Sequence, residues 1–159
     1  FIVPEPLIKK EFSRIMSLKD GLRKMSKSEA SDLSRINLTD NKDQIINKIK
    51  KAKTDTLPLP STIEELEKRP EAKNLIGIYS SLTNNTLQRS IDEFSGKNFS
   101  DFKEKLSEII VNEINPISSK VKELLNDKVF LEKILKDGCE KANEIASKKI
   151  KKIHEIVGF

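Results

Sequence analysis

Apolar residues in the second half of the chain recur every three or four positions, which is the period of a helix and not that of a strand. Asn126 and Asp127 interrupt the pattern with turn-forming side chains, so we predict two long helices, the first beginning at Asn98 or Ser100. Pro116 is expected to kink or briefly break the first of them. The residues expected to face a core are Phe102, Leu106, Ile109, Ile110, Ile114, Ile117, Val121, Leu124, Leu125, Leu131, Ile134, Leu135, Ala142, Ile145, Ala146, Ile150 and Ile153.

Shorter helices are predicted before these two, each bounded by residues that favour helix ends. Thr, Asp or Asn favours a helix start, as does proline at the first helical position, and glycine favours a helix end. The expected segments are a helix from Thr39 or Asp40 to about Lys53, a break at the prolines of 54–60, a turn over 61–68, a helix over 70–83, and a helix capped by Thr86 and ended by Gly96. No strand pattern follows Thr39, so the chain is predicted to be mainly α, an antiparallel helical bundle.

Several lysines lie in the last turns of the helix expected to end near Lys53. Lys48, Lys50, Lys51 and Lys53 place positive charge where it meets the negative end of the helix dipole. We interpret them as a solvated helix end, because charge runs are usually exposed. The residues expected to be buried on the other face of this helix are Ile45, Ile46, Ile49 and Ala52.

The N-terminal segment is patterned less regularly. Prolines predict an extended chain over residues 1–7. Residues 11–18 fit either a short strand or a helical turn. Residues 20–37 are predicted to form a loop, because Gly21 adds flexibility and their serines compete with regular structure through side-chain hydrogen bonds.

The composition excludes several classes of protein. Charged residues make up 35% of the chain, and no apolar run approaches the ~20 residues that span a bilayer, so we expect a soluble, cytoplasmic protein without a membrane partner. Cys139 is the one cysteine, which excludes an internal disulfide, and we interpret it as a small packing residue. His154 is the one histidine, so no metal site is predicted, and it is expected at the surface. The net charge of +5 permits RNA binding without indicating it.

The most informative short motif is the run Lys24-Met25-Ser26-Lys27-Ser28 inside the predicted loop. Lysine carries a compact positive charge on a long stem, and serine hydroxyls and loop amides add hydrogen-bond donors, a set that suits phosphate oxygens. Such a set can neutralise the charge that develops when pyrophosphate leaves ATP. An ordinary solvated loop has a similar composition, so the motif alone leaves both interpretations open.

The residues around this motif extend it into a longer pattern. The stretches are Arg14-Ile15-Met16-Ser17-Leu18, Glu29-Ala30-Ser31-Asp32, Arg35-Ile36-Asn37-Leu38-Thr39-Asp40, Lys48-Ile49-Lys50-Lys51-Ala52-Lys53-Thr54-Asp55, Asn74-Leu75-Ile76-Gly77-Ile78-Tyr79-Ser80 and Gly138-Cys139-Glu140-Lys141-Ala142-Asn143-Glu144-Ile145-Ala146. Together they closely resemble bacterial and organellar tryptophanyl-tRNA synthetases, which are class I aminoacyl-tRNA synthetases, over nearly the whole chain. The resemblance implies a tryptophan–tRNA ligase, which activates tryptophan with ATP and then esterifies tRNA.

The resemblance also implies roles for individual residues. Lys24 and Lys27 match the catalytic lysines that engage the triphosphate and stabilise the leaving pyrophosphate. Ile15 matches a position whose backbone contacts adenine, which leaves its side chain free to pack in a core. Residues 1–38 would be the edge of a Rossmann-type α/β catalytic domain, and residues 39–159 a helical domain that binds the anticodon. The implied ATP-binding set is Ile15, Lys24, Met25, Ser26, Lys27 and Ser28.

The same resemblance implies partners for the chain. They are ATP, with Mg²⁺ expected beside it but no protein ligand identified, L-tryptophan, and the tRNA for tryptophan. A homodimer is implied for the complete enzyme. On the last predicted helix, Lys141, Lys148 and Lys152 share one side within about 40° and could follow an RNA backbone. A solvated face is the alternative, because the same side also carries Asp137, Glu144 and Glu155.

Two departures from the family pattern bear on these expectations. Glu29 and Ala30 stand where Asp-Pro often follows the motif, which could alter loop closure without removing the lysines. The second class I signature, a His-Ile-Gly-His-type motif, has no counterpart, because His154 is the only histidine. We therefore expect the C-terminal portion of a synthetase, inactive by itself. A stand-alone helical RNA-binding module without catalytic activity and a helical interaction domain remain alternatives.

Overall fold

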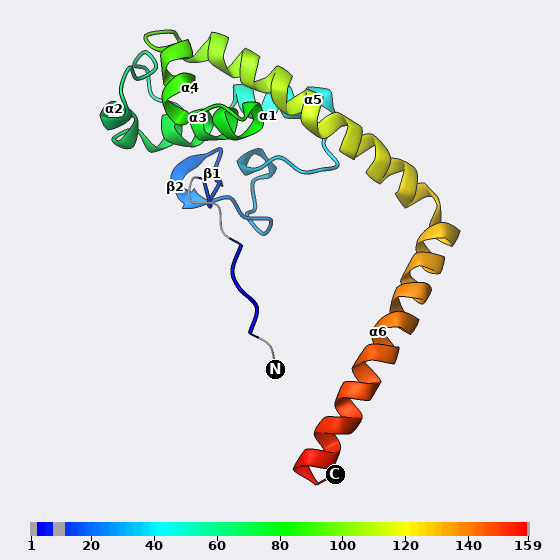
Figure 1. The fold of residues 1–159 in the computed structure, drawn as a ribbon. Coiled ribbons are helices and arrows are strands. Elements are labelled where there is room, and N and C mark those ends of the chain that lie inside the picture. Colours follow the sequence, from blue (N-terminus) through cyan, green and yellow to red (C-terminus); the bar gives the residue numbers. More distant parts are fainter. Residues whose placement is uncertain (1–2, 8–11, 159) are drawn as a thin grey trace. The chain divides into compact units, whose positions relative to one another are not determined.

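Helices make up most of the chain in the computed structural model, which describes residues 3–7 and 12–158 (Figure 1). The elements in chain order are β1 (Met16–Ser17), β2 (Asp20–Lys24), a 3₁₀ turn (Asp32–Ser34), α1 (Lys42–Lys50), α2 (Ile63–Glu67), α3 (Pro70–Thr83), α4 (Leu87–Phe94), α5 (Phe99–Asn126) and α6 (Lys128–Val157). They divide into two compact units, Phe1–Ser118 and Ser119–Phe159. The prediction of a mainly α chain with a small strand-containing remnant is confirmed.

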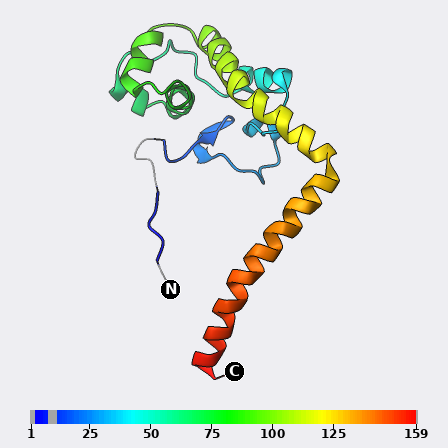
Figure 2. The same ribbon diagram turned by 45° about the vertical axis from the view of Figure 1, so that its right-hand side comes forward.

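β1 and β2 form an antiparallel hairpin that lies beside α3 (Figure 2). Met16 pairs with Lys24 and Ser17 pairs with Asp20, with an irregularity between the two pairs. Because Lys24 is the last residue of β2, the hairpin fixes the backbone up to the first residue of the Lys24–Ser28 motif.

The prediction of a loop over residues 20–37 is therefore wrong for residues 20–24, which form β2. β2 is rich in Asp, Gly and Lys, which disfavour strands, so its pairing depends on contacts with the rest of the fold rather than on its own preference. Within residues 11–18, where a strand and a helical turn were both open, a strand is observed at Met16–Ser17, and residue 11 lies outside the described residues. Residues 3–7 form neither helix nor strand, as predicted.

Two contacts tie the hairpin to α3. The Asn74 side chain accepts a hydrogen bond from the Met16 amide and donates one to the Met16 carbonyl, each at 2.8 Å. Gly21 is buried, and a Cβ added to it would lie 2.6 Å from backbone atoms of Pro70 and Glu71. The prediction that Gly21 provides loop flexibility is therefore wrong. Its missing side chain instead allows the backbone of β2 to lie close to the start of α3.

Replacing Gly21 by alanine is expected to lower the free energy of unfolding by about 1–3 kcal/mol, because the backbone atoms in the way cannot yield as a flexible side chain would. Urea unfolding followed by the fluorescence of Tyr79, the one tyrosine in a chain without tryptophan, measures this. The matched control is Gly138→Ala on α6, where an added Cβ meets no atom within 4 Å. That change should raise helix stability by up to about 1 kcal/mol, so losses of equal size in both variants would contradict the explanation.

α1 begins later than predicted, because Asn41 and not Thr39 or Asp40 caps it. The Asn41 side chain accepts from the Gln44 amide at 2.9 Å, and the Gln44 side chain accepts from the Asn41 amide at 2.8 Å. This reciprocal pair is a capping box, which satisfies two backbone donors at the start of the helix. The last helical residue is Lys50.

α3 and α4 begin and end where the sequence predicts. α3 opens at Pro70 and is followed by Asn84, whose φ of 53° places it in the left-handed region. The Thr86 hydroxyl caps α4, and Gly96 follows that helix with a φ of 70°. Between α1 and α3, residues 54–60 contain neither helix nor strand, as predicted, whereas the expected turn over 61–68 contains the short helix α2.

The core of the first unit centres on three aromatic rings from α3, α4 and α5. The ring centroids of Tyr79, Phe94 and Phe102 lie 4.8–5.9 Å apart. The Tyr79 hydroxyl donates to Glu93 at 2.9 Å, and burial, reinforced by that carboxylate, raises the pKa of Tyr79 to about 12. Tyr79 is therefore a core aromatic. The other buried apolar residues are Leu18, Ile45, Ile49, Ala52, Leu59, Leu66, Ala72, Leu75, Ile76, Ile91, Phe99, Leu106 and Ile110, while Ile46 is exposed, contrary to expectation.

α5 is continuous through Pro116, so the break considered there is not observed. The helix starts just after Asn98, whose side chain accepts from the Asp101 amide at 2.9 Å. A proline lacks the amide that would bond to the carbonyl four residues earlier, that of Asn112. Both Pro116 and Asn112 are exposed, so water can satisfy that carbonyl. Asp127 caps α6, which confirms the predicted turn between the two long helices.

α6 has no buried residue, so the burial predicted for its apolar face is wrong. Leu131 and Ile153 are half-buried. A Cβ added at Gly138 would meet no atom within 4 Å, and Cys139 is exposed rather than packed. His154 is exposed, as expected. The other residues expected in a core but exposed are Ile117, Leu125, Ile134, Leu135, Ala142, Ile145, Ala146 and Ile150.

Candidate functional site

The Lys24–Ser28 motif leaves the hairpin and forms a short turn at the surface of the first unit. The Met25 amide donates to the Ile15 carbonyl at 3.0 Å, and the half-buried Met25 side chain packs against the core. Lys24, before it, and Lys27, after it, are exposed. The motif is thus anchored by its apolar residue, while both ammonium groups can meet a ligand from solvent.

Hydrogen bonds within the motif close the turn. The Ser28 amide donates to the Ser26 hydroxyl at 3.3 Å, and the two serine hydroxyl oxygens lie 3.0 Å apart. The Glu29 amide donates to the Ser26 carbonyl at 3.4 Å, which places Lys27 inside the turn. The arrangement offers hydroxyl and ammonium donors within a few residues of each other, which suits an anion with several oxygens.

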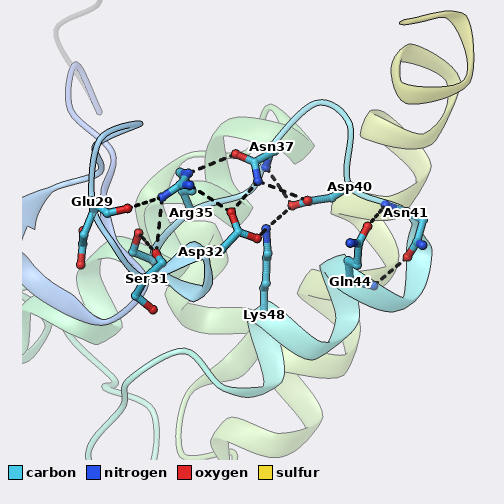
Figure 3. Close-up of polar contacts among 10 residues, drawn as sticks. Glu29, Ser31, Asp32, Arg35, Asn37, Asp40, Asn41, Gln44 and Lys48 are labelled. Atoms are coloured by element: carbon cyan, nitrogen blue, oxygen red, sulfur yellow. Dashed lines mark hydrogen bonds and ion pairs between the residues drawn. The ribbon is translucent and has the colours of Figure 1, made fainter. Parts of the chain in front are cut away.

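Beyond the turn, Arg35 holds the chain that leaves the motif (Figure 3). Its guanidinium donates to the carbonyls of Glu29 at 2.9 Å and Ser31 at 3.4 Å. It also donates to the Asn37 side-chain oxygen at 3.1 Å, and another of its nitrogens lies 3.1 Å from a carboxylate oxygen of Asp32. The rigid fork of donors on arginine allows one side chain to serve all four groups.

The network reaches α1 through Lys48, whose side chain is 4% exposed. Its Nζ lies 2.7 Å from Asp32 and 2.6 Å from Asp40 (Figure 3). The Asn37 amide donates to the Asp40 carboxylate at 2.9 Å, and the Ser118 hydroxyl donates to the Asp40 carbonyl at 3.1 Å. The interpretation of a solvated helix end is therefore wrong for Lys48, although the other three lysines of that run are exposed.

The hydrogen bond from Lys48 lowers the pKa of Asp32, the bond from Asn37 adds to this, and the charge of Arg35 acts in the same direction. Because its pKa is lowered in the folded state, the ionised Asp32 carboxylate stabilises the folded state at pH values above the ordinary aspartate pKa. That contribution is lost only as the pH falls through the still lower pKa of the folded state. At neutral pH, Asp32 is therefore charged and can hold both basic partners.

Comparison with known proteins places this arrangement in a family. The sequence model of the family described as tRNA synthetases class I (W and Y) matches residues 1–115. The chain belongs to this family. The match includes the hairpin, the Lys24–Ser28 motif and the network around Arg35, so these features of the first unit all lie within the class I synthetase match.

Relatives of this class I synthetase chain carry a more specific name. A tryptophan–tRNA ligase from Agrobacterium fabrum is 49% identical over 159 residues, which are 100% of this chain and 45% of the relative. One from Rickettsia felis is 51% identical over 157 residues, 99% of this chain and 47% of the relative. The chain thus spans about half the length of the curated relatives it matches.

Solved structures of synthetases have a similar fold. The tryptophanyl-tRNA synthetase from Mycoplasma pneumoniae aligns with a TM-score of 0.74 at 27% identity, over 95% of this chain and 45% of that one. The enzyme from Campylobacter jejuni, complexed with ADP and tryptophan, aligns with a TM-score of 0.69 at 25% identity, over 98% of this chain and 47% of that one. The similarity to both covers nearly all of this class I synthetase chain.

The lysines predicted to bind tRNA lie on the exposed surface of α6. Lys141, Lys148 and Lys152 are all exposed, and the Nζ of Lys148 lies 2.9 Å from a carboxylate oxygen of Glu144. Glu144 thus offsets part of the positive charge of the three lysines, as expected from the acidic residues on the same side of the helix. A role of the three lysines in tRNA binding by the class I synthetase remains a prediction.

Neither a metal-ligand group nor a membrane-spanning helix is found among the residues that the structure describes. Within 3–7 and 12–158, no three His, Cys, Asp or Glu side chains gather in a group that could hold a metal ion. Over the same residues, no helix combines the length and the apolar composition needed to cross a membrane.

Sequence reasoning found the Lys24–Ser28 motif of this class I synthetase and missed the network behind it. The missed side chains are those of Asp32, Arg35, Asp40 and Lys48, which lie before and within α1. One signal was available for Lys48: it lies three residues after Ile45 and next to Ile49, so helical spacing places it beside the residues predicted to face inward.

Proposed function

We propose that the chain is the C-terminal part of a tryptophan–tRNA ligase, which activates tryptophan with ATP and then transfers it to tRNA. Relatives that are 49% and 51% identical carry this name, which favours tryptophan over tyrosine within the family. Residues 1–38 then form the edge of the catalytic domain, and residues 39–159 form the helical domain that binds the anticodon. The comparisons favour this function over a stand-alone RNA-binding module.

The observation that carries the proposal is the exposure of Lys24 and Lys27 on a turn that is anchored on both sides. In the activation step, the tryptophan carboxylate attacks the α-phosphorus of ATP, the bond to the β-phosphate oxygen breaks, and pyrophosphate leaves with the electron pair. The two ammonium groups stabilise the negative charge that moves onto the pyrophosphate. The hydroxyls of Ser26 and Ser28 add donors around the same oxygens.

Adenine would be contacted by the backbones of Ile15 and Met25. The Ile15 carbonyl and the Met25 amide bond to each other at 3.0 Å, so contacts to adenine would use the remaining backbone groups of these residues. Mg²⁺ would arrive with ATP. The ammonium and hydroxyl groups of the turn do not form a ligand set that suits this cation, which prefers carboxylate oxygens and water, so we assign no step to the ion.

The remaining partners follow from the same proposal. L-Tryptophan would bind mainly outside this chain, in the part of the relatives that the chain does not span. Tryptophan tRNA would bind along the helical domain, with Lys141, Lys148 and Lys152 of α6 contacting its backbone. A homodimer in the cytoplasm completes the proposal.

The test joins this chain to the N-terminal part of the Agrobacterium fabrum relative that it does not match, which gives a hybrid ligase. We expect the hybrid ligase to catalyse tryptophan-dependent exchange of pyrophosphate into ATP and to charge tryptophan tRNA. The chain alone is expected to show no exchange above background. Exchange by the chain alone, or exchange that requires tyrosine, would contradict the proposal. A folded but inactive hybrid that still binds this tRNA specifically would favour the RNA-binding module.

A further inference from the structure

We propose that Arg35 is a positioning residue for the Lys24–Ser28 turn, acting through the Glu29 and Ser31 carbonyls and oriented by Asp32 and Lys48. This inference rests on the proposed function and adds to it a residue that does not itself touch ATP. Its consequence is that the contacts of Arg35 govern how well the enzyme uses ATP, and not how well it binds tryptophan.

The first step of the argument is the place where Arg35 acts. Glu29 directly follows the motif, and its carbonyl accepts from the Arg35 guanidinium at 2.9 Å, while its amide bonds to the Ser26 carbonyl at 3.4 Å. The same guanidinium reaches the Ser31 carbonyl at 3.4 Å. Arg35 therefore holds the trailing end of the turn through backbone groups, which every residue type possesses, so Glu29 and Ala30 in place of Asp-Pro leave these contacts intact.

The second step is that Arg35 is itself held in place. Its side chain is 17% exposed, and Asp32 lies 3.1 Å from it on one side, while Asn37 accepts from its Nε at 3.1 Å. Asp32 is fixed in turn by the buried Lys48 at 2.7 Å. Lys48 belongs to α1, whose inner face is part of the core. Arg35 and Asp32 therefore connect the turn to a helix that is packed into the first unit.

The third step is the sensitivity of charge stabilisation to position. Lys27 lies only two residues before Glu29, so a shift of the Glu29 carbonyl moves the backbone that carries its ammonium group. A catalytic group misplaced by about 1 Å can cost about 100-fold in rate. Loss of the guanidinium fork should therefore weaken both ATP binding and turnover, while the tryptophan site is unaffected.

The kinetic test uses Arg35→Lys in the hybrid ligase. Lysine keeps the positive charge but cannot bond to two carbonyls, Asn37 and Asp32 at once. We expect kcat/KM for ATP to fall by about 10–100-fold, with KM for tryptophan within about twofold of the unsubstituted hybrid. The matched control is Arg89→Lys, the same change at an exposed residue of α4, which should leave both constants unchanged. An Arg35→Lys hybrid with unchanged ATP kinetics overturns the proposal.

A second measurement uses the 159-residue chain and needs no activity. The Glu29 and Ser34 amides, which bond to the Ser26 and Ser31 carbonyls, should exchange their hydrogens about tenfold faster in Arg35→Lys. The Met25 amide, which bonds to the Ile15 carbonyl just beyond the ends of the two strands, should exchange at its original rate. Equal acceleration at all three amides would indicate general loosening, and no acceleration would show that Arg35 does not hold the turn. Either result overturns the proposal.

A third variant tests whether Asp32 orients Arg35. Asp32→Asn keeps the size of the side chain and removes the charge that faces both basic partners. It should change the ATP kinetics in the same direction as Arg35→Lys, and the double variant should lose less than the product of the two single losses. If the loss in kcat/KM for ATP of the double variant equalled the product of the two single losses, Asp32 would not act through Arg35. If the unsubstituted hybrid is inactive, the proposed function fails, and hydrogen exchange alone then decides whether Arg35 anchors the turn.

Discussion

Replacing Lys27 by methionine should lower kcat for tryptophan-dependent pyrophosphate exchange by the hybrid ligase by about 10²–10³-fold, the usual cost of losing one group that stabilises charge in a transition state. Methionine retains a long apolar stem and removes the ammonium group. The free energy of unfolding should change little, because the Lys27 side chain is exposed. KM for tryptophan should stay within about twofold, since the lost contact is made to the phosphates.

The control for this variant is Lys51→Met, which removes the charge of another exposed lysine just after α1. Its exchange rate should equal that of the unsubstituted hybrid ligase. Steady-state kinetics with ATP and tryptophan varied in turn separate the two constants. A Lys27→Met enzyme that bound tryptophan weakly but turned over normally would contradict the role given to Lys27.

The largest loss of stability is expected for Lys48→Met in the 159-residue chain. Removing one partner of a buried ion pair typically costs about 3–5 kcal/mol, because the other charge is left uncompensated. Asp40, with a side chain 5% exposed, would be that uncompensated charge, and it would keep only its bonds with Asn37. We expect the free energy of unfolding to fall by about 3 kcal/mol, measured by urea unfolding with Tyr79 fluorescence.

Two further variants make this result specific. Lys50→Met, an exposed lysine on the same helix, should change the free energy of unfolding by less than about 0.5 kcal/mol. Adding Asp40→Asn to Lys48→Met removes the uncompensated charge, so the double variant should recover part of the lost stability. A double variant no more stable than Lys48→Met would mean that the loss arises from packing and not from charge.

Element boundaries set by local chemistry were predictable from the sequence. Pro70 at the first helical position, Asn84 in the left-handed region and the Thr86 cap each act within a few residues of their own position. The mainly α class followed from the same short-range periodicity. The Lys24–Ser28 motif was predictable for a different reason, because its chemistry and its flanking residues were recognisable as a set.

Features that depend on distant partners were not predictable in the same way. Gly21 is constrained by the start of α3, far away in sequence, so its role as a point of close approach had no local signature. The burial of Lys48 depends on Asp32 and Asp40 folding back over α1. Lys48 was interpreted as solvated because it belongs to a run of lysines, and the sequence does not show which carboxylates another segment brings to it.

The apolar face of α6 shows the remaining limit. Helical spacing correctly gave one long helix after the turn at Asn126 and Asp127, and it also indicated which residues share a face. Whether such a face is covered depends on what lies against it, and no residue of α6 is buried in this chain. The predicted core positions at Ile134 and Ile145 were therefore wrong, although the helix that carries them was right.

The two signature lysines differ in how far their backbones can travel. The Lys24 backbone belongs to a paired strand, whereas Lys27 lies in the segment 26–28, between residues Met25 and Glu29, which are held by hydrogen bonds to Ile15 and Arg35. At about 3.5 Å per residue, these three residues span roughly 10 Å at most when fully extended. If both lysines bind the departing pyrophosphate as proposed, Lys24 is held by the paired strand, whereas the backbone of Lys27 can shift over only a short distance to follow it.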